Sequence, residues 1–172
     1  MSVAVIVGAY NAAATIARAV RSALAQVEVS QVIVVDDGSS DNTANSARAA
    51  DDGSGRLIVE RLPANRGPSA ARNHALALAL ATADAVAIVD SDDVLVPGRF
   101  ARLFAVPDWD MIADNLLFVS NTIDPTATAV PQVAGTPRAI RLDAFIDGSV
   151  QGRSRTRTKL GFLKSVIRRT LL

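Results

Sequence analysis

The chain has 172 residues, which suits one domain with a substantial hydrophobic core, and it has no cysteine. The lack of cysteine excludes disulfides and cysteine-based zinc or redox sites, and it is compatible with a reducing cytoplasm. The net charge of +1 is unevenly distributed, because residues 153–172 carry seven basic residues and no acid, whereas the rest of the chain is acidic. No apolar run approaches the roughly 20 residues that span a bilayer. No basic region precedes the first apolar run, as it would in a signal peptide.

Apolar runs that are typical of strands alternate with runs that have helical spacing. Strands are expected at residues 3–7, 32–35, 57–61 and 85–89, and helices at residues 12–26, 42–50, 68–81 and 97–104. Pro68 suits the first position of its helix, where no N–H group is needed. This order predicts an α/β fold with a mainly parallel sheet covered on both faces. In such sheets ligands bind outside the carboxyl ends of the strands.

The second part of the chain has weaker patterns. We expect a further strand or two at residues 111–119, a loop at 120–137, a helical turn at 141–146 and a polar, basic stretch at 151–157. Residues 159–172 place apolar side chains at helical spacing and end in cations, which predicts a basic amphipathic helix. Such a helix packs against its own domain more often than it binds a membrane, but a peripheral contact with anionic lipid is an alternative.

Each of the first four strands is followed by groups that suit a polar ligand. These groups are Gly8-Ala9-Tyr10-Asn11, Asp36-Asp37-Gly38-Ser39, Asn65-Arg66-Gly67 and Asp90-Ser91-Asp92-Asp93. The last group places three carboxylates within four positions, where they repel one another unless a cation or water separates them. Carboxylate oxygens favour hard ions, so this strand end predicts a Mg²⁺ or Mn²⁺ site, with a solvated acidic turn as the alternative. The sequence has neither the G-x-x-x-x-G-K-[ST] nor the G-x-G-x-x-G phosphate motif.

Four segments in this order resemble glycosyltransferase family 2, whose fold is GT-A. They are Val5-Ile6-Val7-Gly8-Ala9-Tyr10-Asn11, the segment 34–43, Asn65-Arg66-Gly67 with Ala71-Arg72-Asn73, and Asp90-Ser91-Asp92-Asp93. One departure is Gly8, because proline is usual at that position. The segments 109–117 and 161–172 are similar to bacterial exopolysaccharide (succinoglycan-type) members. The resemblance implies a Rossmann-like α/β/α sandwich.

The resemblance also implies a role for each motif. The residues expected to bind a nucleotide-sugar are Gly8, Tyr10, Asp36, Asp37, Gly67, Arg72, Asp90 and Ser91. In this scheme Asp37, together with Asp36, accepts the uracil N3–H, and Tyr10 frames the base. Asp92 or Asp93 holds the metal ion that bridges the two phosphates. Residues 1–120 would then be the nucleotide-sugar-binding half, and residues 121–172 the start of an incomplete acceptor-side region.

The implied activity is metal-dependent, inverting transfer from a UDP-sugar to a saccharide or lipid-linked acceptor in exopolysaccharide synthesis. We expect a cytoplasmic location at the inner face of the membrane, and no nucleic-acid partner. Family members use a carboxylate base, usually in a Glu-Asp pair, to deprotonate the acceptor. The last acids here, Asp143 and Asp147, are not in such a pair. We therefore expect the base to lie beyond Leu172 and this chain to be an N-terminal fragment that transfers sugar poorly.

Three alternatives stay open at this point. The spacing of Asp90, Asp92 and Val94 also matches the nucleophile motif of haloacid-dehalogenase-like phosphatases. A nucleotidylyltransferase shares the architecture but normally has a basic, glycine-rich first loop, which is missing here. A non-catalytic nucleotide-binding fragment is the third alternative. Of the remaining candidates, His74 is expected to be a surface or packing residue and Trp109 a core residue.

Overall fold

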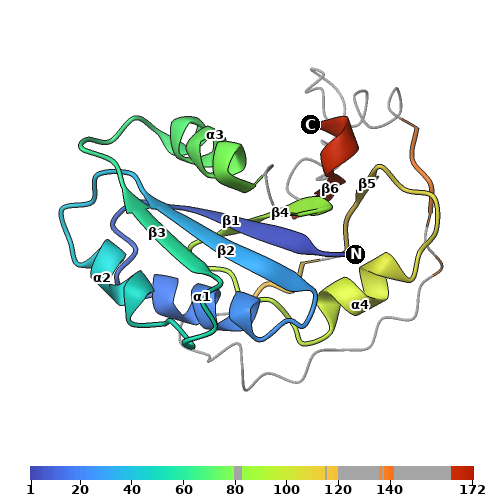
Figure 1. The fold of residues 1–172 in the computed structure, drawn as a ribbon, viewed down its shortest axis with the longest axis horizontal. Coiled ribbons are helices and arrows are strands. Elements are labelled where there is room, and N and C mark those ends of the chain that lie inside the picture. Colours follow the sequence, from blue (N-terminus) through green and yellow to red (C-terminus); the bar gives the residue numbers. More distant parts are fainter. Residues whose placement is uncertain (80–82, 115, 120–135, 137, 142–163) are drawn as a thin grey trace.

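One twisted sheet with helices on both faces organises the molecule, as seen in a computed structural model (Figure 1). The structure describes residues 1–79, 83–114, 116–119, 136, 138–141 and 164–172. Within them, six strands form the sheet in the order β3-β2-β1-β4-β6-β5. The predicted α/β class with a mainly parallel sheet is confirmed.

The parallel part of the sheet contains the four predicted strands. They are β1 (Val3–Ala9), β2 (Val29–Asp36), β3 (Leu57–Arg61) and β4 (Ala85–Asp90). The chain runs outward from β1 to β2 and β3, and then returns to the other side of β1 to form β4. This reversal creates a crevice between the carboxyl ends of neighbouring strands, where ligands bind in open α/β sheets.

Helices cover both faces of the sheet (Figure 1). One face carries α1 (Ile16–Leu24), α2 (Thr43–Arg48) and α4 (Arg99–Phe104), whose apolar side chains pack into the larger core cluster. The other face carries α3 (Pro68–Ala79), which buries alanines at every fourth position. Small side chains let this helix lie close to β1 and β2. The predicted helix at 12–26 is shorter than expected, because its first residues form a turn that bonds to Asp41 in the loop after β2 and to Thr43 at the start of α2.

The last part of the chain differs from the prediction. Val166–Arg168 forms β6, antiparallel to β4, and β6 pairs in turn with β5 (Met111–Ile112). A short 3₁₀ turn, Arg169–Leu171, follows. The expected helix is therefore wrong for residues 166–168. The free edge of β4 supplies hydrogen bonds to a β-branched segment, and Val166 becomes fully buried there.

Several predicted features fall on other parts of the chain. Residues 159–163 and 151–157, and nearly all of the expected loop at 120–137 and turn at 141–146, lie outside the described residues. Of the described residues in the segment 111–119, where a strand or two is expected, only Met111–Ile112 forms a strand. Among the described helices, none combines the length and apolar character needed to cross a membrane.

Candidate functional site

The carboxyl ends of β1 and β4 lie side by side, with Gly8 level with Asp90 in the parallel register. Because β2 lies on the other side of β1, the loops after these three strands reach the same edge of the sheet. The segment before α3 reaches it as well, since it bonds to the loop after β2. The structure therefore brings the four polar segments together, as the topology of the predicted fold requires.

Asp37 fixes the loop that precedes α3. Its side chain is buried, with 2% of the residue exposed, and its two carboxylate oxygens accept the backbone N–H groups of Arg66 and Gly67 at 2.9 and 2.8 Å. Gly38 makes the close approach of this loop feasible. Its φ is +69°, and a Cβ there would lie 2.6 Å from the backbone carbon of Ala64. The two residues together determine where the loop crosses the end of β2.

The loop after β1 is bonded to the loop after β2. The Asn11 side-chain oxygen accepts a hydrogen bond from the backbone N–H of Ser40 at 2.9 Å. The hydroxyl oxygen of Thr43 accepts one from the backbone N–H of Ala12 at 2.8 Å. Tyr10 projects beside this junction and is 51% exposed. A cavity of about 120 Å³ lies next to it, lined by Gly8, Ala9, Tyr10, Asp37, Asn65, Pro68 and Ala71. The cavity thus combines an aromatic ring, backbone from the end of β1 and a buried carboxylate.

Asp36 occupies a supporting position. It has no exposed surface, its Oδ1 accepts the backbone N–H of Ser39 at 3.0 Å, and its Oδ2 lies 3.6 Å from Arg61 Nε. These contacts hold the turn that follows β2. In this conformation Asp36 offers no surface to a ligand, and of the two neighbouring carboxylates only Asp37 lines the cavity.

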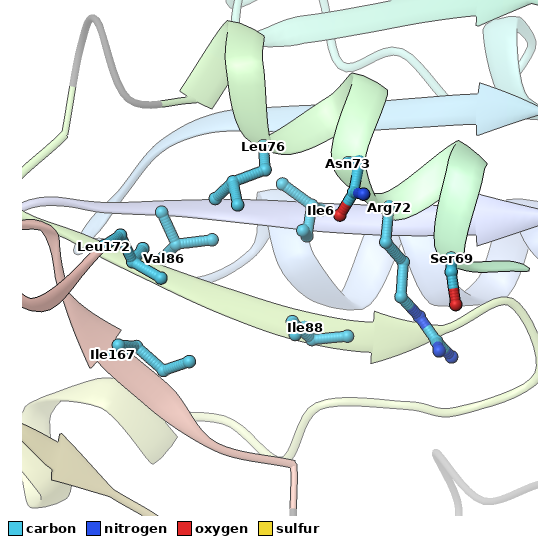
Figure 2. A pocket seen from close by; sticks show the side chains of 9 residues that line it. All are labelled: Ile6, Ser69, Arg72, Asn73, Leu76, Val86, Ile88, Ile167 and Leu172. Carbon is cyan, nitrogen blue, oxygen red and sulfur yellow. The ribbon is translucent and has the colours of Figure 1, made fainter.

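The acidic end of β4 is held between two cations. Arg72 donates to Asp90 Oδ1 at 3.0 Å, and Lys164 Nζ contacts Asp90 Oδ2. The same ammonium lies 3.1 Å from Asp93 Oδ2, a buried oxygen that accepts no other hydrogen bond from the part of the chain that the structure describes. Figure 2 shows Arg72 reaching from α3 toward the carboxyl end of β4. Two carboxylates and two basic side chains therefore form one charged cluster.

The protonation of this cluster follows from its contacts. Burial disfavours the charge on Asp90, but Lys164 and then Arg72 outweigh that effect, so the pKa of the Asp90 carboxyl is lowered from its ordinary value. Burial also opposes the charge on Lys164. Its contacts with Asp90 and Asp93 prevail and raise the pKa of the ammonium. The pair is therefore ionised at neutral pH.

The other residues of the acidic turn have different positions. Asp92 is exposed, and its backbone oxygen accepts a hydrogen bond from Arg18 of α1 at 3.3 Å. Ser91 is partly buried in the same turn. Among the described residues, no three acidic, histidine or cysteine side chains converge on one point. Two carboxylates still suit Mg²⁺ or Mn²⁺, since such ions usually take one or two carboxylates and complete their shell with phosphate and water.

Lys164 is a site residue that the sequence reasoning missed. Its neighbours in the sequence predicted a basic amphipathic helix, whereas pairing of β6 with β4 brings Lys164 to the acidic turn. Arg99 stabilises this arrangement from α4, because its buried guanidinium bonds to both oxygens of Asp114 and to the backbone oxygen of Lys164. No local pattern signals the contacts of Lys164 with Arg99 and Asp90, which are 65 and 74 positions away in the sequence.

Two candidates have the structural positions expected of them. Trp109 is buried, stacks on Phe104 and carries the Arg168 guanidinium over its ring, 4.7 Å from the centroid. His74 lies on the surface of α3, where its Nε2 contacts the Glu60 carboxylate. Neither contributes to the charged cluster.

A second cavity, of about 190 Å³, lies between α3 and the strands β4 and β6 (Figure 2). Its lining is mostly apolar, and its polar residues are on α3. They are Ser69, Arg72 and Asn73. The cavity therefore borders the charged cluster through Arg72.

Comparison with known proteins decides the family. The model of the family described as glycosyl transferase family 2 matches residues 4–127. The chain belongs to glycosyl transferase family 2. It is 47% identical over 171 residues to the succinoglycan biosynthesis protein ExoU of Rhizobium meliloti strain 1021, a match that covers 99% of this chain and 49% of that protein. The chain thus spans about half the length of the curated relatives it matches.

Solved structures of glycosyltransferases share the fold. The S. aureus TarS 1–349 structure aligns with a TM-score of 0.71 and 26% identity, over 100% of this chain and 48% of that one. A TarS 1–349 complex with UDP aligns with a TM-score of 0.58 and 29% identity, over 77% of this chain and 38% of that one. The mannosyltransferase PcManGT from Pyrobaculum calidifontis, in complex with GDP-Man and Mn²⁺, has a TM-score of 0.57 and 27% identity, over 64% and 34% of the two chains. These matches do not favour the phosphatase alternative.

Proposed function

We propose that this chain is the donor-binding part of a family 2 glycosyltransferase that uses a UDP-sugar and a divalent metal ion. The observation that carries the proposal is the cavity beside Tyr10, which lies at the crevice between β1 and its neighbours and contains the buried carboxylate of Asp37. A flat, partly apolar base with an N–H group suits that combination. The solved TarS complex with UDP supports a uridine nucleotide.

Asp37 would serve two purposes in this proposal. Each carboxylate oxygen has a second lone pair beyond the one that accepts the backbone N–H of Arg66 or Gly67. That free capacity is available to the uracil N3–H, while the existing bonds keep the carboxylate in place. Gly67, whose φ is +90°, contributes its backbone to this loop. Tyr10 would cover one side of the base.

The charged cluster would bind the diphosphate side of the donor. Asp90 and Asp93 are the carboxylates that would hold Mg²⁺ or Mn²⁺, with Asp92 beside them as a further donor from the same turn. A divalent ion at this position would stabilise the negative charge of the departing diphosphate without a proton. Arg72 adds a fixed positive charge to the same region, since its guanidinium is anchored on Asp90. The Mn²⁺ in the PcManGT structure supports metal use by this fold.

The properties of the whole protein are also part of the proposal. The similarity to ExoU supports transfer to a saccharide or lipid-linked acceptor in exopolysaccharide synthesis. Inversion and a cytoplasmic location follow the family resemblance, and the absence of cysteine is compatible with a reducing compartment. The peripheral membrane contact through the basic C-terminal segment stays a prediction, although residues 166–168 of the expected helix form β6. Arg168, counted with that helix, lies over Trp109.

Calorimetric titration of the 172-residue chain tests the proposal. UDP, GDP and dTDP are added with and without Mn²⁺, and we expect the tightest binding from UDP with the metal. Asp93→Asn should reduce the metal effect more than Asp92→Ala, because Asp93 faces the cluster and Asp92 faces solvent. Asp110→Asn, at an exposed carboxylate outside the site, is the matched control. The assignment would be contradicted if UDP does not bind, or if UDP binds with the same affinity with and without Mn²⁺.

A further inference from the structure

Lys164 is placed at the end of β4 by the fold rather than by chance contact of a flexible tail. Strand β6 pairs with β4 in an antiparallel register in which Val166 is level with Ala87. Continuing this register places Lys164 opposite the carboxyl end of β4. Arg99 holds the Lys164 backbone oxygen from α4, and only 18% of the lysine side chain is exposed. The ammonium group is therefore delivered to a defined position.

That position is between the two carboxylates that face the cluster. Lys164 Nζ contacts Asp90 Oδ2 and lies 3.1 Å from Asp93 Oδ2. The remaining oxygen of Asp90 is already bonded to Arg72. Among the described residues, Asp93 Oδ2 has no hydrogen-bond partner apart from this ammonium group. Lys164 thus supplies the positive charge that keeps these two carboxylates close together.

A metal ion held by the same two oxygens would need nearly the same space. Divalent ions bind carboxylate oxygens at roughly 2.0–2.6 Å, which is shorter than an ordinary ammonium hydrogen bond. An ammonium left in contact with these oxygens would then face a doubly charged ion at close range in a partly buried site. Repulsion at such a distance is strong because little water separates the charges.

We propose that Lys164 is a built-in counter-ion that competes with the divalent ion for Asp90 and Asp93, so that metal binding displaces its ammonium group. This inference rests on the proposed function, because it concerns the same metal site. Its consequence is weak binding of the metal alone. Diphosphate oxygens add ligands to the ion and give the displaced ammonium an alternative anion, so donor and metal bind more tightly together than separately.

The test measures Mn²⁺ affinity without nucleotide, from the loss of the free Mn²⁺ electron paramagnetic resonance signal on titration with the 172-residue chain. Lys164→Met keeps the length and removes the charge, and we expect it to tighten Mn²⁺ binding about tenfold. Lys164→Arg keeps the charge and should stay within about threefold of the wild type. Arg21→Met removes one exposed charge from α1 and should leave the affinity unchanged. Asp93→Asn should weaken binding.

The outcomes separate this inference from the proposed function. If Lys164→Met binds Mn²⁺ no more tightly than the wild type, or if neither binds it, the competition is refuted. If Lys164→Met binds Mn²⁺ no more tightly than the wild type, but the wild type binds UDP in the calorimetric titration, the proposed function is still supported. If Lys164→Met tightens Mn²⁺ binding but UDP does not bind, the competition between Lys164 and the metal ion is supported and the nucleotide assignment fails. Should Lys164→Met not fold, Lys164→Gln, which keeps a polar end, provides the same comparison.

Discussion

The anchoring of the loop before α3 by Asp37 leads to a quantitative prediction. In Asp37→Asn one carbonyl oxygen still accepts a backbone N–H, but an NH₂ group faces the second donor. One of the two hydrogen bonds from Arg66 and Gly67 is therefore lost, and a buried donor is left without an acceptor. Since a hydrogen bond to a charged group contributes about 1.5–3 kcal/mol, we expect the free energy of unfolding to fall by about 2–4 kcal/mol.

Urea unfolding followed by the fluorescence of Trp109 measures this change. Trp109 is the single tryptophan of the chain and is buried against Phe104, so its emission reports the loss of the core. The control Asp110→Asn should change the free energy of unfolding by no more than about 0.5 kcal/mol. A loss below about 1 kcal/mol for Asp37→Asn would refute the anchoring role. In that case the carboxylate would serve the ligand alone.

Two further predictions concern stability. Gly38→Ala places a methyl group 2.6 Å from the backbone carbon of Ala64, so it should lower the free energy of unfolding by more than about 2 kcal/mol in the same urea assay. Gly53→Ala, at φ +76° with nothing within 4 Å, should cost only about 1 kcal/mol, and equal losses would show that close approach is unimportant at Gly38. Hydrogen bonds from the backbone N–H and hydroxyl of Ser2 lower the pKa of Asp84 from 3.8, so its stabilisation is present above that pH and is lost as the pH falls through the lowered value. Thermal unfolding of Asp84→Asn should therefore depend less on pH than that of the wild type between about pH 5 and about pH 3, and identical profiles would contradict the linkage.

Most of the sheet could be predicted because its strands are short apolar runs with clear boundaries. Residues 57–61 were expected as a strand and form β3 with those bounds. The acidic ends of β2 and β4 follow directly from such runs, so a polar edge of the sheet was predictable too. The two adjacent acids Asp36 and Asp37 could not be distinguished in this way. Their contacts separate them, because Asp36 bonds the turn that follows β2, whereas Asp37 bonds the loop before α3 and lines the cavity beside Tyr10.

The sequence by itself determined the parallel α/β layers, the polar strand ends and the family motifs, because these depend on local periodicity and on residues close together in the chain. Only the tertiary structure decided that residues 166–168 form a strand and where Lys164 lies. Apolar spacing favoured a helix there, but the unpaired edge of β4 supplies hydrogen bonds and a buried place for Val166. Pairing between strands about 80 positions apart leaves no local pattern, and that pairing carries the lysine to the acidic turn.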